Sequence, residues 1–435
     1  MKAHYNKVIN KIEFCSNVEC GSSQKQLLKE LEKRGFDTKL CFQTPQARYL
    51  SNKTQAGRFL LRLEQYIAYP IRMVVTFLFQ SIQSILFQPN AQPSNPNSLS
   101  EKHKEESTHR CKTQRIAIVT TNPFFAPFLA TFFHPNVVHL IWDLYPETMI
   151  HAKKWSANSI KSQVVSWIIK KTLQRSQLNV FIGNRLRIHV EKIYGKVPNA
   201  AVIDVGSNQS LFKKSPKQRT KFPQTSTVPT ILYCGLLGHL HDAETFLSVW
   251  RDWSSSSKSS KKGLQDHCHS SVYRDLMPNF RFYCSGAKRA TLEKSVVALP
   301  DGIRTKIHLG FGLNDQDWAE QLQSSAVSLI TIVPGAETVL MPGRTYSSML
   351  AGQALLAIAP EASDLVDLVK IAKCGWWVCP GDSDKLKDIF KEILTFPEKL
   401  LEKRENAYQY AHQHLGQNTL AKKWHSSFET FILQS

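Results

Sequence analysis

The chain opens with apolar and helical segments in the order strand, helix, strand. Residues 11–15 form a short apolar run, and a loop containing Gly21 follows it. In residues 22–36 the leucines recur at helical spacing, and residues 37–42 form the next strand. Two strands joined through a helix favour a parallel arrangement, because a crossover of this length is what parallel neighbours require. The pattern therefore predicts a βαβ unit and a parallel sheet.

The same alternation continues along the chain and divides into two series. Further predicted strands of the first series lie at 115–121, 137–142, 178–183 and 200–206. Those of the second series lie at 230–238, 280–286, 306–311, 327–332, 354–359 and 375–380. The two series meet near residues 207–223. The sequence thus predicts an α/β protein with two parallel-sheet halves, and a ligand would bind at the carboxyl ends of the strands.

The chain has 435 residues, more than one hydrophobic core usually organises. We therefore expect two Rossmann-like domains, at residues 1–210 and 211–412. Residues 413–435 are predicted to form a C-terminal helix that packs back on the N-terminal domain. Residues 88–112 are rich in Pro, Asn, Ser and charge without periodicity, which is typical of a flexible insert.

Residues 59–87 are strongly apolar and are divided by Pro70. The second piece, 71–87, is near the lower limit for a helix that spans ~30 Å of hydrocarbon. It contains Arg72 and Gln80, which a helix surrounded by lipid tolerates poorly. Basic residues upstream favour a helix that lies at a membrane surface over one that spans the bilayer. An ordinary helix buried in the protein is the alternative interpretation.

The overall charge is strongly basic, because 55 Lys and Arg residues stand against 35 Asp and Glu residues, a formal net charge of +20. Such a surface attracts polyanions: nucleic acid, anionic lipid headgroups or diphosphate ligands. The sequence has neither the aromatic pattern of an RNA-recognition motif nor helix-turn-helix spacing, so we expect no nucleic-acid partner. A mean hydropathy of −0.27 excludes a bundle of membrane-spanning helices.

The nine cysteines include no pair at C-x-x-C spacing. The cluster His267-Cys268-His269 has the residue types of a metal site, but its Ser- and Lys-rich surroundings favour a solvated loop. The first residues do not have the pattern of a signal peptide, so we expect a cytoplasmic protein with reduced thiols.

The segment MPGRTYSSMLAG, residues 341–352, contains the groups that a nucleotide diphosphate requires. Two phosphate charges can be neutralised by a protein cation and by amide N–H groups at a helix N-terminus. Gly343 permits close approach of the backbone, and Arg344 opens the helix with a guanidinium that matches phosphate oxygens. A solvent-facing arginine at a helix start is the alternative.

Two further strand ends of the second half contain glycine or basic residues. Gly235 and Gly238 fit a tight turn near the phosphates, in a loop that also holds two histidines. Lys288 and Arg289 follow the next strand and are stronger cations for the diphosphate. Either could instead be a solvated charge at a helix start.

Four blocks of the chain resemble glycosyltransferase family 4, which has the GT-B fold, and in particular its branch that builds bacterial envelope polysaccharides and exopolysaccharides. The blocks are CGSSQKQLLKELEKRGF, IWDLYPETMI, IYGKVPNAAVIDVGSNQSLF and MPGRTYSSMLAGQALLAIAPEASDLVDLV. They span nearly the whole chain, and the last is the most specific. The resemblance implies retaining transfer of a sugar from a nucleotide-diphosphate donor, of the UDP or GDP type, to a lipid-linked or polysaccharide acceptor.

Within the last block the resemblance assigns roles residue by residue. Arg344 stands where relatives carry the phosphate-binding lysine. The two glutamates that usually hold the donor sugar and the ribose are replaced by Val339 and Ser347. Glu337, two residues from the first of these positions, is the candidate for the sugar, and the Ser347 hydroxyl is the candidate for the ribose. The resemblance also places Gly21 near the donor phosphates.

In the first half, the strand that ends in IWDLYPE carries the candidate catalytic residues. Relatives place a histidine or an aspartate against the reacting sugar there, and Asp143 matches that position. We expect Asp143 to position the acceptor or to take its proton, with Glu147 as the second candidate. His139 lies in the middle of the strand and is predicted to be a core residue.

The expected reaction needs no cofactor and no metal, because protein cations neutralise the diphosphate. We expect the enzyme at the inner face of the plasma membrane, peripherally bound to its anionic surface. A nucleotide-sugar epimerase and a non-catalytic relative remain open on the same fold. The epimerase would need acid and base groups that cannot be placed here, and the missing glutamates favour the non-catalytic relative.

Overall fold

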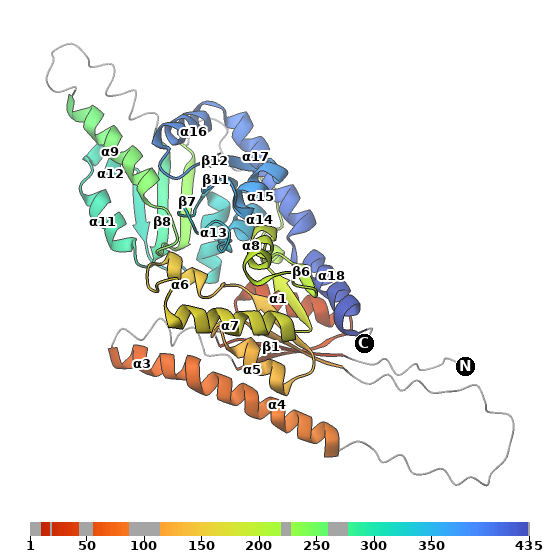
Figure 1. The fold of residues 1–435 in the computed structure, drawn as a ribbon. Helices are drawn as coiled ribbons and strands as arrows, with labels where there is room; N and C mark the ends of the chain where they lie inside the picture. Colours follow the sequence, from red (N-terminus) through yellow and green to blue (C-terminus); the bar gives the residue numbers. More distant parts are fainter. Residues whose placement is uncertain are drawn as a thin grey trace, which may run out of the picture.

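The computed structural model describes residues 10–17, 20–42, 55–86, 114–218, 228–259 and 277–433. It contains two six-stranded parallel sheets, each covered by helices (Figure 1). The first sheet has the strand order β2-β1-β3-β4-β5-β6, and the second has the order β12-β11-β10-β7-β8-β9. The predicted α/β architecture with two parallel-sheet halves is confirmed.

The first sheet lies entirely in the first half of the chain. Its strands are β1 (Lys11–Cys15), β2 (Asp37–Cys41), β3 (Arg115–Thr120), β4 (Val137–Ile141), β5 (Leu178–Phe181) and β6 (Ala200–Val202). The helices between them are α1 (Ser22–Glu32), α5 (Ala126–Phe133), α6 (Glu147–His151), α7 (Ile160–Arg175) and α8 (Asn184–Tyr194). Every residue of β4 and β5 is buried, as expected where helices cover both faces of a parallel sheet. The leucines of α1 are buried as well, which confirms the helical spacing seen in the sequence.

The second sheet repeats the arrangement. Its strands are β7 (Thr230–Leu236), β8 (Asn279–Ser285), β9 (Ile307–Gly310), β10 (Val327–Thr331), β11 (Ala354–Ile358) and β12 (Gly375–Val378). Its helices are α9 (Glu244–Ser259), α11 (Arg289–Val297), α12 (Asp301–Arg304), α13 (Asp315–Ser324), α14 (Arg344–Leu350), α15 (Asp364–Ala372), α16 (Ser383–Thr395) and α17 (Pro397–His414). Rings of Phe246, Trp250 and Phe282 pack against one another and anchor α9 on the sheet.

The apolar segment forms one long helical arm, with α3 (Gln55–Leu63), a π-helical stretch η1 (Glu64–Ala68) and α4 (Tyr69–Leu86). Pro70 does not interrupt it. The π-helical stretch η1 ends two residues before the proline, and the Tyr69 N–H bonds the Glu64 carbonyl oxygen in the π-helical register. One stripe of α4, formed by Tyr69, Met73 and Phe77, is fully buried in a cluster with β1, β3 and α5.

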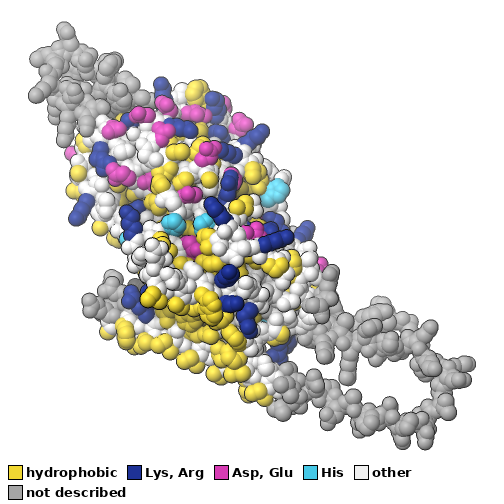
Figure 2. All heavy atoms as spheres, in the orientation of Figure 1, with side chains coloured by type: hydrophobic (Ala, Val, Ile, Leu, Met, Phe, Trp, Pro, Cys, Tyr) yellow, Lys and Arg dark blue, Asp and Glu magenta, His cyan; other side chains and the backbone are white. Residues whose placement is uncertain are grey.

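The opposite stripe of α4 is apolar and exposed. Ile71, Val75 and Phe79 expose 57%, 58% and 60% of their surface. Figure 2 shows hydrophobic side chains gathered over α3 and α4 along one edge of the molecule, with Lys and Arg side chains beside them. The segment is therefore partly a buried helix and partly an apolar surface. Within the described part of the chain, no helix is both long and apolar enough to cross a membrane.

The C-terminal helices connect the two halves. Helix α17 packs on α14 and on the second sheet, and α18 (Gln417–Phe428) packs on α1, with the short η3 (Glu429–Leu433) after it. The ring of Phe36 meets those of His425 and Phe428 edge-on, at 5.1 and 5.7 Å between centroids. Arg34 donates to the side-chain oxygen of Asn418 at 2.6 Å. Helix α18 thus lies beside α1 (Figure 1).

Some predicted features lie outside the described residues, namely the insert at 88–112 and the cluster His267-Cys268-His269. The Ser- and Lys-rich stretch that leads to this cluster was predicted as a solvated loop, but it begins as helix, because α9 continues to Ser259. That part of the prediction is wrong, since packing of the helix around Trp250 and Trp253 outweighs the weak helix preference of serine. The cysteines among the described residues are free thiols.

Candidate active site

The carboxyl ends of the two sheets face each other through a set of contacts between the halves. Asp364, at the start of α15, accepts a hydrogen bond from the backbone N–H of Arg185 in α8 at 3.0 Å. The guanidinium of Arg185 forms a two-pronged ion pair with Asp367, at 2.7 and 3.1 Å. Gly335, after β10, lies beside His151 at the end of α6. The loops after β4 and β5 therefore meet those after β10 and β11, where a ligand was predicted.

Arg344 occupies the first position of α14, and its guanidinium lies 4.1 Å from the centre of the Tyr233 ring. Its Nη2 donates to the carbonyl oxygen of Leu236 at 3.1 Å, and the Tyr233 hydroxyl donates to the same oxygen at 2.8 Å. Its Nη1 is buried and has no hydrogen-bond partner among the described residues. A buried charged donor without an acceptor is costly, so the arrangement favours an anionic ligand at Nη1.

His241 lies in the neighbouring loop and is buried. Its Nδ1 accepts the backbone N–H of Gly238 at 3.2 Å, so the neutral ring carries its proton on Nε2 and can donate from there. Burial, and then the charges of Arg344 and Lys288, lower the pKa of His241 to about 3. The ring is therefore a neutral donor at ordinary pH. The sequence could not distinguish it from the other histidine of the loop.

Lys288 belongs to the same group, whereas Arg289 is directed elsewhere. The Lys288 ammonium donates to the carbonyl oxygen of His241 at 2.6 Å, and burial lowers its pKa. Arg289 pairs with Glu293 at 2.7 Å and donates to the Gly310 carbonyl at 2.7 Å. Its charge is already compensated by these contacts. Lys288 is thus the stronger candidate for a diphosphate.

The glycines predicted around the phosphates lie in this group. Gly235 has a φ of +126°, a conformation that side chains rarely adopt, and a Cβ there would lie 3.9 Å from Nη1 of Arg344. Gly238 supplies the N–H that holds His241. A Cβ at Gly343 would have no described atom within 4 Å, so this residue borders open space. A ligand could approach the backbone at both Gly235 and Gly343.

The three residues at or near the positions of the missing glutamates differ in what they can offer a donor. Val339 is buried among core side chains. Ser347 is also buried, and its hydroxyl donates to the carbonyl oxygen of Arg344 at 3.0 Å, so its hydrogen is already used. Glu337 has a buried Oε2 without a partner among the described residues. Its charge acts on His189 of α8, across the contact between the halves.

Asp143 lies two residues after the end of β4, on the side of the site formed by the first half. Its backbone N–H donates to the hydroxyl oxygen of Thr121 at 3.1 Å, which fixes the turn after the strand. Burial raises the pKa of the Asp143 carboxyl. Burial, and then the charge of Asp143, raise the pKa of Tyr145 as well. A carboxylate whose pKa is raised toward neutrality is better suited to accept a proton.

Glu147 starts α6 and is held by α8. Its Oε1 accepts the Tyr194 hydroxyl at 2.9 Å, and burial raises its pKa. Its Oε2 is buried with no partner in the described part of the chain. His139 is fully buried in β4 and bonded to Asn179 at 3.2 Å, and burial lowers its pKa to about 4. The prediction that His139 is a core residue is confirmed.

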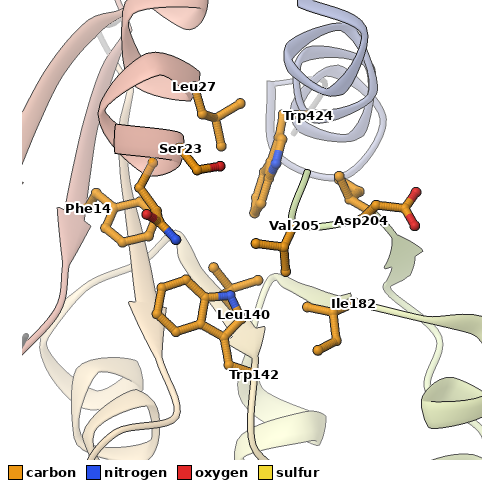
Figure 3. A pocket seen from close by; sticks show the side chains of 11 residues that line it. Phe14, Ser23, Leu27, Leu140, Trp142, Ile182, Asp204, Val205 and Trp424 are labelled. Atoms are coloured by element: carbon orange, nitrogen blue, oxygen red, sulfur yellow. The ribbon is translucent and has the colours of Figure 1, made fainter. Parts of the chain in front are cut away.

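Gly21 directly precedes α1, and the first turn of that helix lines a recess at the carboxyl ends of the strands of the first sheet. The recess is lined by Phe14, Ser23, Gln24, Leu27, Leu140, Trp142, Ile182, Ile203, Asp204, Val205 and Trp424. Figure 3 shows Trp142 and Trp424 on opposite sides, with the Asp204 carboxylate pointing away. Its lining is mostly apolar and has no cation, so the recess does not suit a diphosphate. Trp424 belongs to the C-terminal helix that was predicted to pack on the N-terminal domain, but the sequence did not single out this side chain.

Metal ligands are not gathered in this region. Among the residues that the structure describes, no group of three or more His, Cys, Asp or Glu side chains could hold a metal ion. The positive charge near the glycine loops comes from Arg344 and Lys288.

No family model and no curated protein sequence matches the chain, but solved structures match nearly its whole length. HepE from Anabaena in complex with UDP is 13% identical, with a TM-score of 0.60 over 97% of this chain and 100% of its own. Sucrose-phosphate synthase from Thermosynechococcus elongatus is 12% identical, with a TM-score of 0.63; the match covers 98% of this chain and 100% of the synthase. WaaG, a glycosyltransferase involved in lipopolysaccharide biosynthesis, is 13% identical, with a TM-score of 0.53; the match covers 96% of this chain and 99% of WaaG. These likenesses and the two facing parallel sheets show that the chain has the GT-B fold.

Proposed function

We propose that the protein is a glycosyltransferase that moves a sugar from a nucleotide-diphosphate sugar, of the UDP or GDP type, to a lipid-linked or polysaccharide acceptor. The observation that carries the proposal is Arg344, whose guanidinium is held by Tyr233 and Leu236 while Nη1 finds no acceptor among the described residues. HepE structures of the same fold contain UDP and UDP-glucose, which supports a nucleotide-sugar donor here.

The second half would hold the donor. Arg344 and Lys288 would neutralise the diphosphate, and His241 would donate a hydrogen bond from Nε2. The backbone at Gly235 and Gly343 is open to close approach. Because these groups supply the positive charge, we propose that transfer requires no divalent metal. Unchanged transfer in excess EDTA would support this, and loss of transfer restored by Mg²⁺ would contradict it.

The first half would hold the acceptor. Asp143 would hydrogen-bond the acceptor hydroxyl or stabilise positive charge that develops on the sugar. Glu147, at the start of α6, is the second candidate for this role. Glu337 would face the donor sugar between the halves. Retention of configuration rests on the resemblance to family 4 and would be read from the anomeric proton of the product.

We also propose peripheral attachment to an anionic membrane at its cytoplasmic face, through the exposed stripe of α4. Val75→Asp should reduce sedimentation with anionic vesicles, whereas Val297→Asp, at a more exposed site on α11, should not. Attachment should weaken as salt is raised, since the Debye length shortens. Equal binding to neutral and anionic vesicles would contradict the electrostatic part.

A thermal-shift panel of UDP, GDP, ADP and CDP tests the donor class most directly, because a ligand that binds only the folded state stabilises it by mass action. We expect UDP or GDP to raise the melting temperature. If none of the four does so, the donor site is wrong.

A non-catalytic protein that binds a nucleotide sugar is the second candidate. The absence of carboxylates at Val339 and Ser347 favours it. The two candidates differ in turnover: a transferase releases nucleotide slowly from its own donor sugar even in water, and a binding protein does not. Nucleotide release abolished by Asp143→Asn would support the transferase.

A further inference from the structure

We propose that the acceptor is lipid-linked and that its hydrocarbon chain lies along a row of four aromatic side chains, Tyr66, Phe125, Phe124 and Tyr145. The row leads from the exposed surface of α3 and α4 to Asp143. This inference rests on the proposed function, in which Asp143 is the acceptor-side residue. It adds the class of acceptor and the side chains that bind it.

The outer end of the row belongs to the apolar arm. Tyr66 lies in η1, between α3 and α4, and exposes 43% of its surface. Its neighbours Ile67 and Ile71 are also exposed. Arg72 and Glu64 pair at 2.9 Å and bracket this stretch of helix. The row therefore begins on the surface that we propose to face the membrane.

The inner part of the row comes from the loops at the carboxyl ends of β3 and β4. Ring centroids are separated by 6.5 Å from Tyr66 to Phe125, by 5.3 Å from Phe125 to Phe124, and by 5.6 Å from Phe124 to Tyr145. Phe124, Phe125 and Tyr145 are all half-buried, so each presents part of its ring to solvent or to a ligand. The aromatic contacts are continuous from one end to the other.

The row ends at the candidate catalytic group. Asp143 precedes Tyr145 by two residues, and its charge acts on the Tyr145 hydroxyl. The inner end of the row therefore lies beside this carboxylate. A chain lying on these rings would bring the head of its lipid to Asp143.

The surroundings of the row favour hydrocarbon over a soluble glycan. The row is continuous with the exposed apolar side chains of Ile67 and Ile71, and its two phenylalanines offer rings without hydrogen-bonding groups. A hydrocarbon chain gains by removing apolar surface from water. Continuity with the exposed stripe of α4 allows the rest of the chain to stay in the bilayer.

Farnesyl phosphate is a suitable probe, because it combines a short isoprenyl chain with a phosphate and dissolves without a bilayer. Calorimetry would compare four proteins: wild type, Phe125→Ser, Phe125→Leu and Phe132→Ser. Phe132 is a matched control, because it is an exposed aromatic residue of α5 outside the row. We expect Phe125→Ser to weaken binding about tenfold, with near wild-type binding by Phe125→Leu and Phe132→Ser. A benzophenone analogue of the probe should label peptides that contain Phe124 or Tyr145.

UDP or GDP stabilisation, measured on the same samples, separates this inference from the proposed function. If the nucleotide stabilises all four proteins but farnesyl phosphate does not bind wild type, or binds Phe125→Ser equally well, the row does not hold the acceptor. If Phe132→Ser loses as much binding as Phe125→Ser, the probe adsorbs to exposed aromatic surface in general and the inference is wrong. If the probe binds the row and no nucleotide binds, the proposed function fails instead.

Discussion

Arg344→Ala removes the group on which the donor site depends. In the structure its guanidinium is held by the Tyr233 ring and the Leu236 carbonyl, and Nη1 has no acceptor within the described residues. A diphosphate oxygen at Nη1 would complete its hydrogen bonds. The substitution should therefore weaken nucleotide binding much more than it affects the fold.

The expected losses of nucleotide affinity and of stability in Arg344→Ala follow from these contacts. Loss of a charge-assisted hydrogen bond to phosphate costs about 1.5–3 kcal/mol, or about 10- to 150-fold in Kd. The fold loses one hydrogen bond and a cation–π contact worth about 0.5–1 kcal/mol at an accessible site. For a protein of this size, the melting temperature should fall by no more than a few degrees. Arg344→Lys keeps the charge but not the two-pronged geometry, and should lie between wild type and Arg344→Ala.

Isothermal titration with UDP, or with GDP if the panel favours it, measures the effect. Arg281→Ala is the matched control, because Arg281 lies within β8 and donates to Gln321 at 3.1 Å, away from the glycine loops. Its nucleotide affinity should stay at the wild-type value. Unchanged affinity in a folded Arg344→Ala protein would refute the phosphate assignment.

Three further predictions concern other parts of the molecule. Asp143→Asn should lower transfer about 10²- to 10⁴-fold at unchanged nucleotide affinity, since an amide cannot take a proton; full turnover would leave Asp143 a turn residue. Acid should destabilise the fold partly through His139, whose folded pKa of about 4 lies below the value of about 6.5 in the unfolded chain. The unfolded state binds more protons in that window, so His139 alone should lower the free energy of unfolding by about 2 kcal/mol from pH 7 to 5, and His139→Gln should make the pH profile less steep in urea titrations. A Cβ at Gly183 would lie 2.2 Å from Asp364, so Gly183→Ala should lower the melting temperature and Asp364→Ala should restore part of it; strictly additive losses would count against the clash.

Much of the fold could be predicted because its signals are local. The strand β4 is a short apolar run whose residues are all buried, and α1 shows its leucines at helical spacing. The apolar arm was harder, because both stripes of α4 repeat every four residues. Tyr69, Met73 and Phe77 form the buried stripe, while Ile71, Val75 and Phe79 form the exposed one. Both stripes are apolar, so the sequence pattern does not distinguish them, and packing against α5 and the sheet decides which stripe is covered.

The candidate site could be predicted only where residue type itself indicates the chemistry. Arg344 beside Gly343 suggested phosphate binding from the sequence, and the geometry supports it. The partners of Arg344 could not be predicted, because Leu236 is 108 residues away and Tyr233 has the pattern of an ordinary core strand residue. The link between Arg185 and Asp364 spans 179 residues and depends on how the halves meet. Such contacts leave no periodic signal in the chain.

Two carboxylates that would bind the donor sugar and ribose are missing, and the structure shows which remaining side chains could replace them. Val339 is buried and apolar, and Ser347 already spends its hydrogen on the Arg344 carbonyl, so a ribose hydroxyl could only donate to it. Glu337 keeps a buried oxygen without a partner among the described residues, and its charge reaches His189 across the contact between the halves. We infer that Glu337 is the carboxylate left for the donor sugar, and that the nucleotide is held mainly through its phosphates. Binding that rests on Arg344 and Lys288 is electrostatic and is therefore screened by salt, whereas a pair of carboxylates on ribose and sugar would add contacts that salt affects little.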